Sequence, residues 1–516
     1  MKTLRNAILF FGMLLLGAVV TTAQDAPQDA PVLTPFTDDV FGVQGRMPEG
    51  WTRVQAGIYA RGSGARDIVL LAIQSAPLSS DALMTALLPQ FALTTAPEST
   101  GFLSSTALDW QLYHFPVTQA GITVEVDLAL AEQVGTTYLV LLQSNEAERE
   151  ALADSVFFPV VGSIQPTAED TSALPYEVEE VTFSSGAVTL AGTLTLPPGG
   201  GPHPAVVLLT GSGGQDRDEQ VAGFRVFRVI ADDLTRRGIA VLRFDDRGIG
   251  ASTGDWASAD LNAFADDARA AIGYLGSREE IDDEQIGVLG HSIGGALAAI
   301  LGADPASGAA FLISMAGPGV AGRETLLEQN RVILAQQGAS QAQIDSQIAF
   351  LRDAMPLIEA RDWDAYKQLA HDTLIEQWGL LSEEQRAEVG VSSAEEFAET
   401  VGANGFTTVS SEEFVSLLSY DPAPDWEKTT VPVLALFGEF DLQVSPGSHA
   451  PALEAAFEAG GNPDAAVVII AGANHLFQHT ETGAIEEYSQ LPPEFTADFL
   501  PTIAGWILER VTVAIP

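Results

Sequence analysis

The fold is decided by Ile286-Gly-Val-Leu-Gly-His-Ser292-Ile-Gly-Gly-Ala-Leu-Ala-Ala-Ile-Leu301. Its first half is a short apolar run with the character of a buried strand, and its second half is a series of small and apolar residues typical of a buried helix. Glycines on both sides of Ser292 allow the backbone of the turn to approach its neighbours closely. The stretch therefore predicts a strand that runs directly into Ser292 and a helix that leaves it.

Further apolar strands occur on both sides of this stretch, with helical segments between them. Such alternation predicts a mostly parallel sheet that is covered by helices on both faces, so the fold class is α/β. A hairpin formed by residues 178–183 and 188–196 is expected to precede the sheet. The other expected strands are residues 205–210, 239–244, 286–289, 311–314, 431–437 and 466–470.

One long interval, from about residue 322 to 424, contains no convincing strand. It is rich in helix-forming sequence, for example at residues 325–337 and 340–361. Expected strands of the sheet lie on both sides of it, so we interpret it as a helical cap inserted beside the carboxyl edge of the sheet, where open α/β sheets bind ligands. The alternative is a separate helical domain with no relation to a pocket.

The rest of the chain divides by composition. Residues 36–165 combine strand patterns with two helical patterns and predict a small α+β accessory domain. Residues 166–175 have the Pro- and Ser/Thr-rich composition of a linker, and residues 176–516 form the expected α/β domain with its cap.

The amino terminus has the pattern of a secretory signal. Lys2 and Arg5 precede the apolar run from Ala7 to Val20, and small residues lead up to Ala23. A run of this length spans about 21 Å as a helix, which is shorter than a ~30 Å hydrocarbon core and argues against a permanent membrane anchor. We therefore expect residues 1–23 to be a signal peptide, residues 24–35 a flexible leader, and the protein to be exported.

Composition narrows the possible partners. The 516 residues carry a formal charge of −45, which repels phosphate backbones and argues against nucleic acid as a partner. Cysteine is absent, which excludes disulfides, thiolate metal sites and a cysteine nucleophile. No metal or cofactor site is expected, because clustered histidines and carboxylates suited to zinc are also missing.

Two serines match the pattern Gly-x-Ser-x-Gly, and context separates them. Ser292 has the strand before it and the helix after it that lift a nucleophilic hydroxyl above a sheet. Ser252 follows a glycine-rich turn and no strand abuts it. Ser292 is therefore the candidate nucleophile, and Ser252 is interpreted as a loop residue.

A serine hydroxyl needs a base to take its proton and an acid to orient that base, in the chain order Ser, Asp or Glu, His. Asp441 follows the strand that ends at residue 437, and His475 follows the last strand. Both are thus expected at the same sheet edge as Ser292. Glu439 is the alternative acid, while His479 is disfavoured because it lies farther from its strand end.

Two backbone amides should stabilise the oxyanion of such a reaction. One is expected from Ile293, directly after the nucleophile, and the other from the loop after the first parallel strand. Within that loop, Thr210-Gly-Ser-Gly-Gly214, we select the amide of Ser212, with Gly213 as the alternative. The loop lacks the Gly-Lys-Ser/Thr ending that would grip a nucleotide phosphate.

Several linked motifs resemble those of a bacterial α/β-hydrolase esterase family, related to serine aminopeptidase-like and dienelactone-hydrolase-like hydrolases. The resemblance covers roughly residues 177–511 and leaves the amino-terminal domain outside. This chain departs from the pattern at Ile293, where relatives often carry an acid, and at Gly214, where they often carry proline. The motifs are Gly211-Ser-Gly-Gly-Gln-Asp-Arg-Asp218, Arg243-Phe-Asp-Asp-Arg-Gly-Ile-Gly250, Gly290-His-Ser-Ile-Gly-Gly295, Gly438-Glu-Phe-Asp-Leu-Gln-Val444 and Gly472-Ala-Asn-His-Leu-Phe477.

The resemblance implies an α/β-hydrolase fold, a triad of Ser292, Asp441 and His475, and hydrolysis of carboxylic esters with short acyl chains. We thus expect a small-molecule ester as substrate, no cofactor, and no stable membrane insertion once the signal is cleaved. A serine peptidase or thioesterase with the same triad is the alternative, and a catalytically inactive binding protein is a second one. The natural substrate and the oligomeric state are not predicted.

Overall fold

The computed structural model describes residues 31–513, with gaps at 39, 62–67, 92, 94, 120–121, 134, 168–170, 384 and 387–392. The predicted signal peptide and most of the predicted leader lie outside the described residues. The chain divides into two compact units, a larger one containing residues 171–380 and 401–513 and a smaller one containing residues 31–170 and 381–400. The change from one unit to the other at residues 170 and 171 falls inside the predicted linker.

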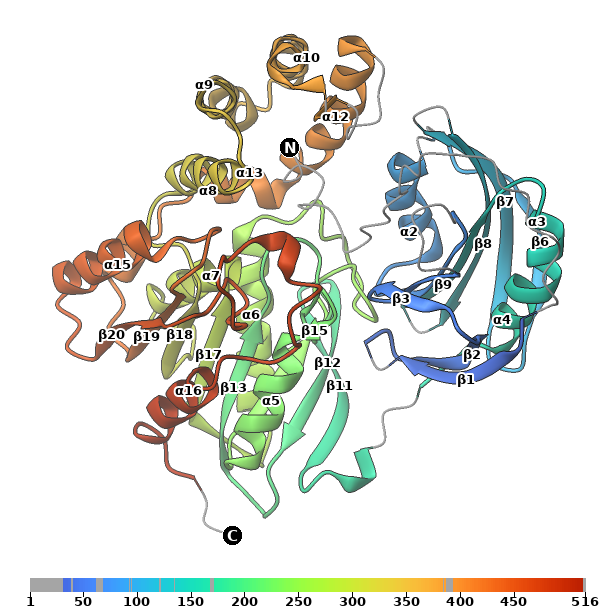
Figure 1. The fold of residues 1–516 in the computed structure, drawn as a ribbon. Coiled ribbons are helices and arrows are strands. Elements are labelled where there is room, and N and C mark those ends of the chain that lie inside the picture. Colours follow the sequence, from blue (N-terminus) through green and yellow to red (C-terminus); the bar gives the residue numbers. More distant parts are fainter. Residues whose placement is uncertain are drawn as a thin grey trace. The chain divides into compact units, whose positions relative to one another are not determined.

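An eight-stranded sheet forms the centre of the larger unit (Figure 1). Its strand order is β11-β12-β16-β13-β17-β18-β19-β20, and the pairings from β16 to β20 are all parallel. The hairpin of β11 and β12 pairs antiparallel at one edge. The strands are β11 (Glu177–Ser185), β12 (Val188–Leu196), β13 (His203–Leu209), β16 (Ala240–Phe244), β17 (Ile281–His291), β18 (Phe311–Met315), β19 (Val433–Gly438) and β20 (Ala465–Ile470).

Helices cover both faces of this sheet, as the alternating pattern predicted. On one face α5 (Val226–Arg236) and α16 (Phe499–Leu508) pack against alternate strand residues such as Val206 and Leu208. On the other face α6 (Leu261–Gly276), α7 (Ile293–Gly302) and α15 (Pro446–Gly460) pack against the intervening residues. The strands are apolar on both faces because both faces are buried in separate cores.

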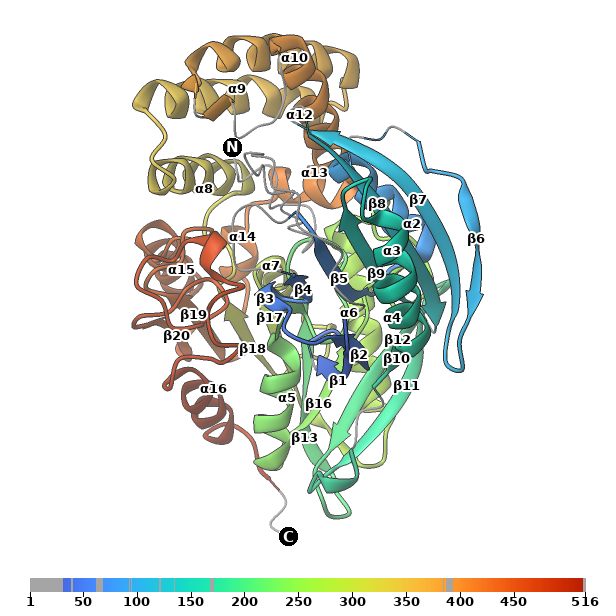
Figure 2. The same ribbon diagram turned by 45° about the vertical axis from the view of Figure 1, so that its right-hand side comes forward.

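The predicted cap interval is helical, and no described residue between β18 and β19 belongs to a strand. Figure 2 shows α8, α9 and α10 stacked at the end of the sheet where α7 begins. A core of its own, which includes Ile348, Leu351 and Val415, holds these helices together. The helices are α8 (Gly322–Gln336), α9 (Gln341–Glu359), α10 (Trp363–Leu380), α12 (Ala394–Val409), α13 (Glu412–Ser419) and α14 (Ala423–Trp426).

Hydrogen bonds join this cap to the sheet-containing body. The Ser416 hydroxyl of α13 accepts a bond from the amide of Leu261 at 3.1 Å, at the start of α6. The Gln337 side chain, just after α8, donates to Glu486 at 2.7 Å. These bonds join α13 and the residue after α8 to the sheet-containing part of the larger unit, whereas residues 381–400 of the cap interval belong to the smaller unit.

The smaller unit is an α+β structure, as predicted. Its seven-stranded antiparallel sheet has α2 (Ser80–Leu87) and η1 (Leu88–Phe91) packed on one face, and α3 (Arg149–Leu152), η2 (Ala153–Phe157) and α4 (Phe158–Ser163) on the other. Two buried cores result, one on each side of the sheet. The strands, in sheet order, are β3 (Thr52–Gln55), β4 (Ile58–Ala60), β5 (Leu70–Ala76), β9 (Thr136–Ser144), β8 (Ile122–Gln133), β7 (Asp109–Gln119) and β6 (Ser99–Ser104).

A separate three-stranded sheet begins within the segment that we predicted to be a flexible leader, residues 24–35. It consists of β1 (Leu33–Asp38), β2 (Val43–Pro48) and β10 (Gln165–Pro166). Strand β1 includes three residues that we assigned to the leader, because the proline-rich composition hid their antiparallel pairing with β2. The short hairpin of β14 (Gln220–Val221) and β15 (Phe224–Arg225) was also not predicted.

In the part of the chain that the structure describes, no helix combines the length and apolar character needed to cross a membrane.

Candidate active site

Ser292 lies on a sharp turn between β17 and α7. Its backbone has φ 53° and ψ −113°, a conformation that a residue with a side chain rarely adopts. The Ser292 amide donates a hydrogen bond to the carbonyl of Met315 at 2.8 Å, which ties the turn to the adjacent strand β18. The strand, serine and helix therefore follow one another as the sequence predicted, and the strained backbone presents the side chain at the sheet edge.

The two glycines of the pattern, Gly290 and Gly294, lie where there is no room for a side chain. A Cβ atom at Gly290 would lie 1.9 Å from the carbonyl oxygen of Gly294, and a Cβ atom at Gly294 would lie 2.2 Å from the carbonyl oxygen of Leu209. Both separations are far shorter than any van der Waals contact. The turn can form only because both positions lack a side chain.

Ser252, the other match to the pattern, has a structural role. Its hydroxyl donates to the carbonyl of Asp245 at 2.7 Å and accepts from the amide of Ala191 at 2.9 Å. The residue is buried, so the hydroxyl holds its loop against β12. Such a doubly engaged hydroxyl is poorly placed to attack a substrate.

Asp441 and His475 meet directly. Nδ1 of His475 donates a hydrogen bond to Oδ2 of Asp441 at 2.8 Å, and both residues are buried. Oδ1 of Asp441 accepts from the amides of Gln443 at 2.8 Å and Val444 at 2.9 Å. The carboxylate is thus fixed by its own loop, and a proton on Nδ1 leaves Nε2 of His475 as the basic nitrogen.

The alternative acid and base point elsewhere. Glu439 accepts a hydrogen bond from the amide of Gly472 at 2.8 Å and makes no contact with His475 among the described residues. His479 is exposed, as is His371 in the cap. The structure therefore brings Asp441 rather than Glu439 to His475.

His475 lies beside the turn that carries Ser292. The rings of His291 and His475 have centroids 4.8 Å apart, and Nε2 of His291 lies 3.1 Å from the carbonyl oxygen of His475. The Ser292 hydroxyl itself forms no hydrogen bond within the described residues, to His475 or to any other group. The structure thus brings His475 to the residue adjacent to Ser292 while leaving the hydroxyl available. In catalytic sites without substrate, the contact between nucleophile and base is often long.

The two amides selected for the oxyanion hole are available. Neither the amide of Ser212 nor that of Ile293 donates a hydrogen bond within the part of the chain that the structure describes. By contrast, the amide of Gly213 donates to Oε1 of Glu413 at 3.1 Å, and the amide of Gly211 donates to Oε1 of Glu219 at 2.7 Å. Two carboxylates therefore hold the glycine amides on either side of Ser212.

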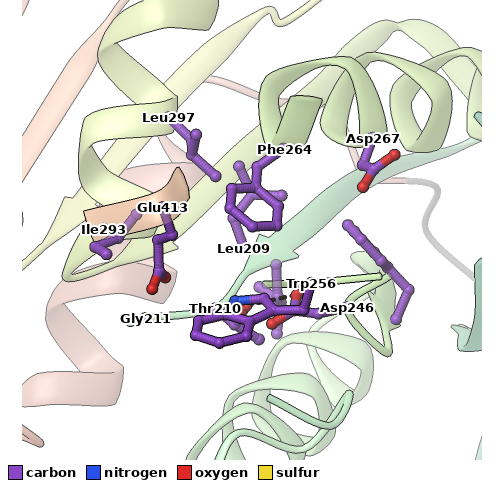
Figure 3. Close-up of a pocket in the computed structure, with 12 residues that line it drawn as sticks. Leu209, Thr210, Gly211, Asp246, Trp256, Phe264, Asp267, Ile293, Leu297 and Glu413 are labelled. Atoms are coloured by element: carbon purple, nitrogen blue, oxygen red, sulfur yellow. Dashed lines mark hydrogen bonds between the residues drawn. The ribbon is translucent and has the colours of Figure 1, made fainter. Parts of the chain in front are cut away.

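A pocket adjoins these amides (Figure 3). It does not include the side chains of Ser292, Asp441 or His475. It is therefore a space beside the reacting groups, on the side of the oxyanion amides and the cap. The lining residues are Leu208, Leu209, Thr210, Gly211, Phe244, Asp246, Trp256, Phe264, Asp267, Ile293, Leu297 and Glu413.

Buried carboxyl groups give this pocket its electrostatic character. Burial raises the pKa of Glu413 to about 7, although hydrogen bonds from Gly213 and Trp256 act in the opposite direction. Burial also raises the pKa of Asp246 well above its usual range, against hydrogen bonds from Gln215 and Thr210 and with help from the nearby Glu413 and Glu219 charges. Protons are thus retained in the pocket at pH values where exposed carboxyl groups are ionised.

The described residues contain no group of three or more histidines and carboxylates that could hold a metal ion. Two buried acids near the candidate oxyanion hole were not singled out from the sequence. Glu219 directly follows the motif that ends at Asp218, and this position next to the motif was a usable signal. Glu413 lies about 200 residues away in the cap, and nothing in its local sequence distinguishes it.

A mostly parallel sheet with a serine on a strained strand-to-helix turn is characteristic of the α/β-hydrolase fold. Residues 223–380 match the family model described as serine aminopeptidase, S33. A 310-residue segment is 26% identical to esterase EstD of Thermotoga maritima, covering 59% of this chain and 62% of that esterase. A shorter segment is 32% identical to an uncharacterized protein of Mycobacterium tuberculosis, over 28% of this chain and 46% of that protein. The chain therefore spans less than two thirds of the length of these relatives.

Two solved structures align with similar coverage. The Pyrococcus furiosus esterase Pf2001 aligns over 66% of this chain and 94% of its own, with a TM-score of 0.38 and 16% identity. A proline iminopeptidase from Mycobacterium smegmatis aligns over 64% of this chain and 98% of its own, with a TM-score of 0.38 and 20% identity. The sequence matches confirm the resemblance to α/β-hydrolase esterases that the motifs indicated.

Proposed function

We propose that the chain is an exported serine hydrolase that cleaves carboxylic esters with short acyl chains. The observation that carries the proposal is the hydrogen bond of 2.8 Å between His475 and Asp441, beside the strained turn that presents Ser292. The similarity to esterase EstD of Thermotoga maritima supports an ester as the substrate.

The proposed reaction has two halves. Oγ of Ser292 attacks the ester carbonyl carbon while Nε2 of His475 takes the hydroxyl proton, and the amides of Ser212 and Ile293 stabilise the oxyanion. The bond from carbon to the alcohol oxygen then breaks, and His475 returns the proton to the leaving alcohol. Water attacks the acyl-serine with the same proton transfers, which releases the acid and restores Ser292. Asp441 stays ionised and orients His475 throughout.

A serine peptidase is the second candidate function. The match of residues 223–380 to the serine aminopeptidase model favours it over a thioesterase, which would use the same groups. The discriminating experiment compares kcat/KM for p-nitrophenyl acetate, butyrate and octanoate with that for aminoacyl p-nitroanilides and acyl thioesters. A preference for the short-chain esters supports the proposal, and a preference for the anilides replaces it with a peptidase.

Export rests on the amino-terminal sequence alone, where Lys2 and Arg5 precede the apolar run. Amino-terminal sequencing of protein recovered from the periplasm or medium of an expressing bacterium tests it. A new terminus at Gln24 supports cleavage after Ala23. Intact protein retained in the cell with Met1 present would contradict export.

A further inference from the structure

Glu219 occupies an unusual place in the candidate site. Its backbone has a φ of 45°, a strained conformation for a residue with a side chain, and only 1% of the residue is exposed. A buried carboxylate on strained backbone is unfavourable unless its partners compensate for it. Two hydrogen-bond donors, the amide of Gly211 and the ring of His291, bond to Oε1, whereas Oε2 is buried with no hydrogen-bond partner among the described residues.

The same oxygen of Glu219 accepts both hydrogen bonds. The amide of Gly211 donates to Oε1 at 2.7 Å, and Nδ1 of His291 donates to it at 2.7 Å. The first contact fixes the loop that carries the Ser212 amide, and the second fixes the residue before Ser292. One carboxylate thus connects the loop after β13 to the turn after β17.

His291 extends this connection to a third loop. Its Nε2 lies 3.1 Å from the carbonyl oxygen of His475, so both ring nitrogens face oxygen acceptors. Burial alone would lower the pKa of His291, but the charge and hydrogen bond of Glu219, the carbonyl of His475 and the charge of Asp441 raise it overall. A protonated ring satisfies both acceptors at once, because each nitrogen then carries a hydrogen.

Space at the junction is limited, which makes the arrangement specific. A Cβ atom at Gly211 would lie 3.0 Å from Oε1 of Glu219, 3.3 Å from Nδ1 of His291 and 3.4 Å from Cβ of Ser292. The acid, the histidine and the nucleophile therefore all lie close to the same side of Gly211. A shift of the carboxylate would be transmitted directly to the loop and to the turn.

We propose that Glu219, acting through His291, is a positioning residue that sets the oxyanion loop, the Ser292 turn and the His475 loop relative to one another. The proposal rests on the proposed hydrolase function, since it assigns Glu219 a part in the same reaction. Glu219 touches no reacting atom. It acts by holding the Ser212 amide and the backbone of His475 in register with Ser292, and small misplacements of such groups cost up to about 100-fold in rate.

The test measures kcat and KM for p-nitrophenyl butyrate with the wild type, Glu219→Gln, Glu219→Ala and the exposed control Glu279→Gln. Glutamine keeps the shape, and its one oxygen can accept both bonds, but it removes the negative charge that favours the protonated His291 ring. We therefore expect kcat to fall about 10-fold in Glu219→Gln and about 100-fold in Glu219→Ala, with KM within about threefold of wild type. The control should keep full activity. Because Glu219→Gln preserves the side-chain volume, its kcat tests the proposal even if Glu219→Ala fails to fold.

A double substitution checks the route through His291. If the two residues act as one unit, Glu219→Gln combined with His291→Asn should lose little more than the worse single variant. Unchanged kcat in Glu219→Gln, a rise in KM alone, or fully additive losses would overturn the proposal. Failure of the wild type to hydrolyse any substrate or to react with a fluorophosphonate would instead overturn the proposed function, so the two failures are distinguishable.

Discussion

Asp441 holds His475 with one carboxylate oxygen and its own loop with the other. Oδ2 accepts from Nδ1 of His475 at 2.8 Å, while Oδ1 accepts from two backbone amides at 2.8 and 2.9 Å. The side chain of Asp441 is fully buried. The orientation of His475 is therefore set by a carboxylate that has no freedom to turn.

Replacing this carboxylate should disable the base without disturbing the fold. In Asp441→Asn the amide can donate to Nδ1 of His475, which forces the proton onto Nε2 and removes the acceptor for the Ser292 hydroxyl. We expect kcat to fall about 10⁴-fold. Steady-state kinetics on p-nitrophenyl butyrate measure the effect.

Glu439→Gln is the matched control, because Glu439 is the neighbouring acid that bonds to Gly472 instead. Its kcat should stay within about twofold of wild type. A large loss in Glu439→Gln together with a small loss in Asp441→Asn would exchange the roles of the two acids.

The turn at Ser292 should not tolerate any side chain at position 290. A Cβ atom there would lie 1.9 Å from the carbonyl oxygen of Gly294, so Gly290→Ala must displace the backbone. We expect it to abolish hydrolysis and to destabilise the fold by about 3 kcal/mol or more, as a lower melting temperature shows.

Gly273 provides the control for that substitution. It lies in α6 with nothing within 4 Å of an added Cβ. Gly273→Ala should leave activity intact and stabilise the helix by up to about 1 kcal/mol. Equal melting temperatures for the two alanine variants would show that the turn is not constrained in this way.

Ser252 and Ser292 should respond differently to alanine. Ser252 is doubly hydrogen-bonded and buried, so Ser252→Ala leaves the amide of Ala191 without its partner. We expect a loss of about 1 to 3 kcal/mol in stability with kcat preserved in the folded enzyme. Thermal unfolding and kinetics on the same samples separate the two effects, and a loss of kcat with unchanged stability would give Ser252 a role that we exclude.

Glu413 should make the larger unit less stable as pH rises. Its pKa is raised by burial to about 7 in the folded protein, so the stabilisation present below the ordinary carboxyl pKa is lost as pH rises through about 7. Glu413→Gln removes that ionisation. The variant should match the wild type near pH 4.5 and exceed it near pH 8, by up to about 3 kcal/mol.

Melting temperatures of both proteins across this pH range test the sign. The difference between variant and wild type should increase with pH. A variant that is less stable than the wild type at pH 8 would mean that the Glu413 carboxylate, bonded to Gly213, stabilises the fold when ionised.

Much of the larger unit followed from local pattern. Apolar strands buried on both faces leave a strong signal, and the elbow around Ser292 was predictable because close backbone packing demands glycine on both sides of it. The loop positions of Asp441 and His475 followed from chain order and from their places after β19 and β20. These features depend on residues that are close in sequence or on the geometry of parallel strands.

What could not be predicted depends on contacts between distant segments. Glu413 reaches Gly213 from a cap helix, and no sequence period encodes that approach. The role of His291 could not be predicted either, because the sequence does not show that its ring meets Glu219 on one side and the backbone of His475 on the other. The strand β1 is an exception, because its partner β2 follows it directly in the chain and only the proline-rich composition hid it.

The availability of the Ser292 hydroxyl to an activated electrophile tests the central proposal most directly. A fluorophosphonate probe forms a covalent bond with a serine only where a base removes the hydroxyl proton, and mass spectrometry locates the modified residue. We expect one label per chain, on Ser292, and no label together with a loss of about 10⁶-fold in turnover for Ser292→Ala. An unlabelled wild type, or a Ser292→Ala variant that is labelled and hydrolyses esters like the wild type, would contradict it.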